Sequence, residues 1–209
     1  MYTRRKIVAL SLAATAVALG GCGREDFLTF VPETPAEAAL RESREALQST
    51  VQEGSALGAA AGAAVGGLLG GVGGAFRGAQ VGQLSGATAG LYVKQLQAQF
   101  AQEQQLLQAV SEDIGRTNAA LEDTIAAMQQ VLAEVQARGT TEEARVERIN
   151  EEVEASVTLA NGYENLFGET RQILISEAVP TGQIDGDLAR LQNTVASMRS
   201  VAQDLSNSL

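Results

Sequence analysis

Apolar residues recur at every seventh position through much of the C-terminal half of the chain. The longest series consists of Val93, Phe100, Leu107, Ile114, Leu121, Met128 and Val135. Further apolar residues fill the three- and four-residue offsets, namely Leu96, Val110, Ile125, Val131 and Leu132. This spacing is typical of a coiled-coil helix. It predicts one unbroken helix from about residue 75 to residue 138, ended by Gly139 as a left-handed cap.

A second heptad series follows almost at once. Thr140-Thr141-Glu142-Glu143 has the pattern of a capping box and predicts the start of a new helix. Its apolar positions are Val146, Val153, Ala160, Phe167 and Leu174, with Ile149, Val157 and Tyr163 between them. The short connection at Gly139 predicts an antiparallel helical hairpin. Asn161-Gly162 and Gly168 are candidate kinks within this helix.

The last helix is expected after the breaker Pro180-Thr181-Gly182, with Asp185 as its N-cap. Its apolar stripe contains Ile184, Leu188, Leu191, Val195, Met198, Val201 and Leu205. An earlier helix is predicted from the capping box of Thr34, Pro35 and Glu37, with Leu40 and Leu47 on its apolar face. We expect this first helix to pack beside the start of the long helix.

Between these helices lies a register of ten glycines, one at every fourth position. They are Gly54, Gly58, Gly62, Gly66, Gly70, Gly74, Gly78, Gly82, Gly86 and Gly90. Glycine inside a helix costs about 0.8–1 kcal/mol relative to alanine, so the register needs compensation. Close packing of helix backbones, as in small-xxx-small motifs, supplies it.

The glycine register predicts a helical hairpin rather than one straight helix. On a helix of about 3.6 residues per turn, each glycine lies about 40° further around the axis than the glycine four residues before it. A straight helix would therefore spread the glycines over its whole surface. Folding at Gly70–Gly74 keeps them on one face of each arm. Large apolar residues are few, so membrane insertion of a single arm is marginal. Packing in a soluble hairpin or inside a homo-oligomer stays open.

The N-terminal segment 1–21 has the three parts of a secretory signal. Arg4, Arg5 and Lys6 form a basic start, residues 7–19 are apolar, and small residues follow. Leu19-Gly20-Gly21-Cys22 then resembles the lipobox of bacterial lipoprotein precursors. The resemblance implies cleavage before Cys22 and lipid attachment to this residue, with Gly23 directing the protein to the outer membrane. The alternative for Cys22 is an ordinary thiol. Residues 22–33 are the expected tether.

The glycine region resembles the two-helix glycine zippers of bacterial envelope lipoproteins and the seventeen-kilodalton surface antigen group. The resemblance is carried by Gly58, Gly62 and Gly66, by the central glycine cluster, and by the exit sequence Gly90-Leu91-Tyr92-Val93-Lys94-Gln95. The second arm departs from a dry hairpin because it contains polar residues and Arg77 lies near the tip. Those polar residues are Gln80, Gln83, Ser85 and Thr88.

Composition excludes several functions. The chain has 25 acidic and 15 basic residues and a net charge of −10, which argues against nucleic-acid binding. It has no histidine and only one cysteine, so zinc sites and histidine-assisted nucleophiles are not expected. The glycines lack the lysine and serine or threonine of a phosphate loop. We therefore expect no enzyme, no metal, no cofactor and no small-molecule substrate.

These patterns together predict an all-α fold, in which a glycine-zipper hairpin continues into a long antiparallel coiled coil or three-helix bundle. The expected parts are a signal peptide (1–21), a lipidated tether (22–33), an amphipathic helix with the hairpin (34–93) and a helical bundle (94–209). The expected function is that of a non-enzymatic outer-membrane lipoprotein facing the periplasm, with a structural or interaction role. Its glycine zipper is expected to pack at or in the membrane, and its coiled coil to project into the periplasm as a spacer or a binding surface. Its expected partners are membrane lipid through Cys22 and further copies or another envelope protein. An oligomeric channel or secretion accessory, and a soluble periplasmic adaptor, are the alternatives.

Overall fold

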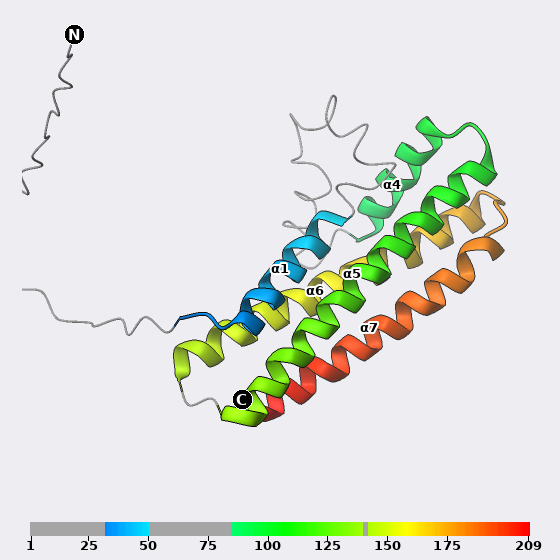
Figure 1. The fold of residues 1–209 in the computed structure, drawn as a ribbon. Helices are drawn as coiled ribbons and strands as arrows, with labels where there is room; N and C mark the ends of the chain where they lie inside the picture. The colour runs from blue at the N-terminus through cyan, green and yellow to red at the C-terminus, as the bar shows by residue number, and fades with distance from the viewer. Residues whose placement is uncertain (1–31, 51–84, 140–141) are drawn as a thin grey trace, which may run out of the picture. The chain divides into compact units, whose positions relative to one another are not determined.

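The computed structural model describes residues 32–50, 85–139 and 142–209, and it is helical without strands in these ranges. The helices are α1 (Pro35–Thr50), α4 (Ser85–Gln99), α5 (Glu103–Arg138), α6 (Glu143–Ser176) and α7 (Gly182–Ser208), shown in Figure 1. The all-α prediction is confirmed. Cys22 and the glycines from Gly54 to Gly82 lie outside the described residues, and so does the predicted hairpin turn.

The heptad positions of the three long helices form the core. In α5 these are Leu107, Ile114, Leu121, Met128 and Val135, all of them buried. Helix α5 ends at Arg138, and Gly139 has a φ of 68° while its N–H donates to the carbonyl of Val135. Glycine adopts a positive φ without steric cost, so the predicted stop at Gly139 is confirmed.

Helix α7 packs against both α5 and α6. Ser111 near the start of α5 donates to Asp187 near the start of α7, so these two helices run in the same direction. Arg171 near the end of α6 pairs with Asp185, whereas the earlier Glu164 pairs with Arg199. Helix α6 therefore runs opposite to α5 and α7, as Figure 1 also shows.

A fourth helical position, beside α5 and α6, is shared by α1 and α4. Helix α1 packs on the second half of α5 and on α6 between Arg145 and Tyr163, and α4 packs mainly on the end of α6. Both run in the direction of α6, one after the other, as the cyan and green helices of Figure 1 show. The glycine segment is thus inserted within one helical position of a four-position bundle. The last three helices do pack together, but the bundle is not limited to them.

The predicted continuous helix from residue 75 to residue 138 is wrong. The chain leaves the helix after Gln99 and restarts at Glu103, and Gln102 has extended backbone angles of −111° and 130°. This break lets α4 fold back so that Tyr92 and Leu96 are buried against the bundle. A straight continuation would carry this apolar stripe away from α6. The one sequence signal for the break is Glu103, an acid at a heptad position.

Two smaller expectations are corrected. Helix α1 lies beside the second half of α5, near the end of the predicted long helix and not beside its start, because Glu37 is bound by arginines at the beginning of α6. Helix α7 begins three residues before Asp185, with Thr181 at the N-cap position, and Asp185 instead binds Arg171. In both cases a tertiary contact outweighs the local preference. Helix α6 is continuous through Gly162 and Gly168, and kinks at these residues stay a prediction.

Candidate functional site

The start of α1 is held by a buried cluster of charged side chains. The backbone N–H of Glu37 donates to the hydroxyl oxygen of Thr34 at 3.3 Å, as the capping pattern predicts. The carboxylate of Glu37 does not complete a capping box, which corrects that part of the prediction. It is only 4% exposed and binds Arg145, and Arg148 at 2.8 Å. Arg145 also binds Glu134 of α5 at 2.9 Å, so the cluster joins α1, α5 and α6.

The electrostatics of this cluster favour ionised groups. Burial by itself would raise the pKa of Glu37, but hydrogen bonds from Arg148 and Arg145 outweigh it and hold the pKa below its usual value. Burial opposes the charged form of Arg145 too, yet its bonds to Glu37 and Glu134 raise the pKa of this side chain. A paired set of buried charges specifies one position of α1 along the bundle.

The end of α1 is held by a different bond. The hydroxyl of Tyr163 in α6 donates to the backbone carbonyl of Leu47 at 2.8 Å, and both residues are buried. Leu47 lies near the C-terminal end of the described part of α1, and the bond attaches this part of the helix to α6. Burial raises the pKa of Tyr163, so this side chain stays a neutral donor.

Tyr92 attaches α4 to two helices at once. Its ring meets the ring of Phe167 edge to face, with centroids 6.1 Å apart and an interplanar angle of 83°. Its hydroxyl donates to the carboxylate of Asp113 in α5 at 2.6 Å. Asp113 also binds Arg116, one turn further along α5. An edge-to-face ring pair and a charge-assisted hydrogen bond both depend on the orientation of the side chain, so together they fix the position of α4 on the bundle.

Burial dominates the acid–base behaviour of this pair. It raises the pKa of Asp113 above its usual value, although hydrogen bonds from Tyr92 and Arg116 oppose the change. Burial and the neighbouring carboxylate raise the pKa of Tyr92 well above its usual value. The hydroxyl of Tyr92 therefore stays protonated, and its hydrogen bond to Asp113 anchors α4 to α5.

The anchors of α1 and α4 meet at one level of α6. Tyr163 binds the end of α1, and Phe167 receives Tyr92. These two α6 positions are four residues apart, about one helical turn and a rise of about 6 Å. The anchors that lie before and after residues 51–84 in the sequence therefore contact α6 at neighbouring levels. We call Leu47, Tyr92, Asp113, Tyr163 and Phe167 the junction.

Only the last two members of the predicted glycine register lie in described helix. Gly86 and Gly90 are both in α4, which continues from there into the junction. A Cβ built on Gly90 would meet no described atom within 4 Å. The other eight glycines and the predicted lipidation site Cys22 lie outside the described residues.

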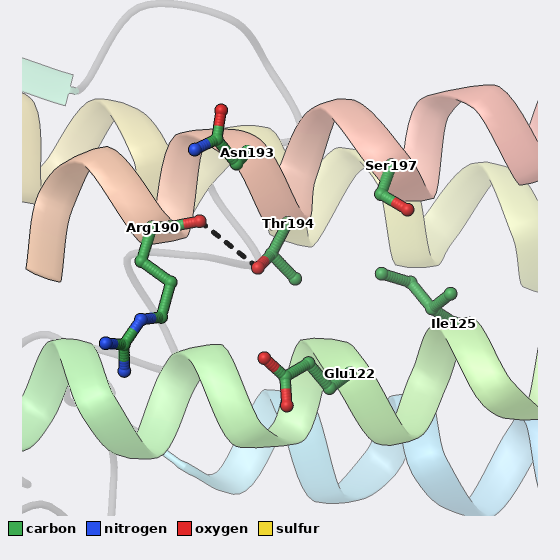
Figure 2. A pocket seen from close by; sticks show the side chains of 6 residues that line it. All are labelled: Glu122, Ile125, Arg190, Asn193, Thr194 and Ser197. Carbon is green, nitrogen blue, oxygen red and sulfur yellow. Dashed lines mark hydrogen bonds between the residues drawn. The ribbon is translucent and has the colours of Figure 1, made fainter.

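A shallow groove between α5 and α7 is lined by polar side chains (Figure 2). It has a volume of about 340 Å³ and is open to solvent. Figure 2 shows Arg190 and Glu122 on opposite helices at one end and Ser197 near Ile125 at the other. Thr194 uses its hydroxyl to bind the carbonyl of Arg190 at 3.2 Å. The lining offers hydrogen bonds and charge but no activated nucleophile.

Two properties of the described ranges bear on function. No group of three or more acidic, cysteine or histidine side chains there could hold a metal ion. Every helix in the described part of the chain is also too short or too polar to cross a membrane.

Sequence reasoning finds the helices but misses the residues of the junction as polar anchors. The heptad spacing places Tyr163 among the apolar positions, and it does not single out Asp113. The available signal is the placement of a polar group within a heptad stripe, since buried polar groups require partners. The identity of each partner, 21 residues away for Asp113 and 116 for Tyr163, follows only from the fold.

Comparison with known proteins gives one informative match. The family model for the YMGG-like Gly-zipper matches residues 1–94, which is less than half of the chain and ends within α4. No curated protein and no solved structure gave a significant match. The matched range contains the whole glycine register and α1, and it stops two residues after Tyr92. The comparison therefore supports a glycine-zipper segment at residues inserted between α1 and α4.

Proposed function

We propose that this chain is a non-enzymatic, lipid-anchored protein of the bacterial envelope. Its glycine zipper packs at or in the membrane, and its helical bundle is a rigid periplasmic body that holds the zipper and offers a binding surface. The glycine-zipper match supports a membrane-associated or envelope role. The lipobox-like sequence Leu19-Gly20-Gly21-Cys22 supports the lipid anchor, and Gly23 supports the outer-membrane location.

The junction is the observation that carries the proposal. Helices that flank an inserted hairpin must bring its two ends together, and the contacts of Leu47 and Tyr92 do so within one turn of α6. The anchors are buried and directional, so the anchored residues on either side of the glycine segment, Leu47 and Tyr92, lie near one another on the bundle. This geometry suits a hairpin that enters and leaves the membrane from the same face.

The exposed surface of the bundle suits a periplasmic setting. The glutamine-rich flank around the break between α4 and α5 is exposed at Gln97, Gln99, Gln102, Gln104, Gln105 and Gln108. These side chains are polar without charge, and they cover the ends of two helices. Such a surface is soluble and still able to form hydrogen bonds with a partner protein.

Membrane extraction tests the proposal. Full-length protein with Cys22→Ser would be expressed in its envelope and washed with alkaline carbonate beside the unaltered protein. We expect the unaltered protein to stay in the membrane pellet and a substantial part of the Cys22→Ser variant to remain with it through the glycine segment. Complete release of the variant into the soluble fraction would contradict a membrane role for the zipper and favour the periplasmic adaptor.

A second variant separates helix pairing from channel formation. Gly66→Leu places a bulky side chain in the middle of the glycine register and should prevent close helix packing. Chemical cross-linking of the envelope is expected to show fewer homo-oligomers, with Ala64→Leu as the matched control outside the register. Ion conductance of the purified protein in planar bilayers would instead establish the oligomeric channel or secretion accessory.

A further inference from the structure

The outer face of α4 differs from its inner face in a way that points to a surface contact. Ala89, Tyr92, Val93 and Leu96 are buried in the bundle. The opposite stripe contains Leu91, Lys94 and Ala98, all exposed. Leu91 is 56% exposed, and the other large exposed hydrophobic side chain in the described residues is Ile175, at 44%. Leu91 is therefore the one large hydrophobic side chain exposed on the described part of α4, and it comes one residue after Gly90.

The charge of α4 is also distinctive. The chain has 25 acidic residues, yet α4 contains neither aspartate nor glutamate, and Lys94 is its one charged residue. Every other helix in the described ranges has acidic residues. An anionic lipid surface repels acidic side chains and attracts lysine. Of the described helices, α4 is the one whose composition matches such a surface.

Two expected attachments are connected in the sequence to the helical position that α1 and α4 share. Helix α1 begins thirteen residues after Cys22. An extended chain of that length spans at most about 45 Å. Helix α6 has 34 residues. At the rise of an α-helix its length is about 50 Å. A lipid anchor at Cys22 and a membrane-bound glycine segment would thus tether the α1–α4 position at its start and near its middle.

We propose that the outer face of α4, with Leu91 and Lys94, rests on the membrane surface, and that the bundle lies along the membrane on its α1–α4 side. Leu91 enters the interface between headgroups and acyl chains, and Lys94 reaches the anionic headgroups. This inference rests on the proposed function, which supplies the two attachments. In this arrangement the bundle lies along the membrane surface and does not project into the periplasm as a spacer.

The absence of tryptophan from the chain permits a direct test. Leu91→Trp and Ile175→Trp each introduce one fluorophore at an exposed apolar position. Ile175 is the matched control because it lies one turn after Arg171, on the side of α6 that faces α7. The full-length lipidated variants would be reconstituted in phosphatidylglycerol-containing vesicles with and without brominated acyl chains, which quench tryptophan on contact.

We expect brominated lipid to quench Leu91→Trp at least two-fold and to leave Ile175→Trp nearly unchanged. Adding Lys94→Glu to Leu91→Trp should weaken the quenching in anionic vesicles more than in phosphatidylcholine vesicles. Equal quenching at both positions, or a blue-shifted Leu91→Trp spectrum without quenching, would overturn the inference, the second by showing a protein contact at this face.

The same samples separate this inference from the proposed function. Flotation of the vesicles reports whether the protein is bound to membrane at all. Protein that floats with the vesicles but shows no quenching at Leu91→Trp retains its membrane role and refutes the flat orientation. Protein that fails to float refutes both.

Discussion

Tyr163 of α6 donates a hydrogen bond to the backbone carbonyl of Leu47, 116 residues earlier in the chain. This bond attaches the described end of α1, which precedes the glycine segment in the sequence, to α6. Tyr92 provides the equivalent attachment after the segment, one turn further along α6. The two tyrosines thus hold the helices on either side of the glycine segment at neighbouring levels of α6.

Tyr163→Phe should destabilise the bundle by about 0.5–1.5 kcal/mol, because it removes the hydrogen bond to the carbonyl of Leu47. Denaturant unfolding followed by helical circular dichroism measures the change in the free energy of unfolding. The control is Thr158→Ala, on the exposed face of the same helix. Its change in unfolding free energy should stay within about 0.5 kcal/mol. Equal stability of Tyr163→Phe and the unaltered chain would show that the bond does not hold α1.

Glu37→Ala should be among the most damaging single changes in α1. It removes the partner of two arginines and leaves the buried charge of Arg145 without this carboxylate. Breaking a buried ion pair in this way costs about 3–5 kcal/mol. Glu42→Ala changes the same residue type on the exposed face of α1 and should have little effect. The same unfolding measurement compares the two, and similar losses for both variants would contradict a structural role for the cluster.

The two buried acids should give opposite pH dependences. The folded-state pKa of Glu37 is lowered, so its ionised form contributes stability that is present above the unfolded pKa of about 4.3 and is lost as the pH falls through the folded pKa. The folded-state pKa of Asp113 is raised. Its contribution is complete below the unfolded pKa of about 3.9 and is lost as the pH rises through the folded pKa.

Glu37→Gln and Asp113→Asn test these signs against the unaltered chain. The stability difference caused by Glu37→Gln should be constant near neutral pH and shrink on acidification below about pH 4. The difference for Asp113→Asn should change as the pH rises above about 4, with the unaltered chain losing stability relative to the variant. Unfolding free energies measured between about pH 3 and pH 8 give both curves, and parallel curves for the two variants would refute the assignment.

Replacing residues 51–84 with a flexible linker of glycine and serine should leave the bundle folded. The anchors of α1 and α4 lie at Glu37, Leu47 and Tyr92, outside the replaced range. Hydrogen exchange should therefore show protected amides in both helices of the shortened protein. Loss of protection in α1 or α4, with α5–α7 still protected, would show that the glycine segment is needed to seat them.

Much of the local structure could be predicted from spacing alone. The heptad residues Leu107, Ile114, Leu121 and Leu174 are buried as expected, and Thr34 and Gly139 begin and end helices as expected. These features depend on neighbours close in the sequence. A helical repeat or a positive φ is encoded by the residues that display it, so no knowledge of the fold is needed.

The sequence by itself determined the all-α class, the helix periods and the glycine register. Tertiary structure alone decided that Glu37 binds two arginines far along the chain, that the helix breaks at residues 100–102, and that α1 and α4 share one position. The physical reason is that a helix stripe shows that a face is buried but not which helix covers it. Among helices with similar stripes, paired charges and buried hydrogen bonds select the partner, and they are formed by residues far apart in the chain.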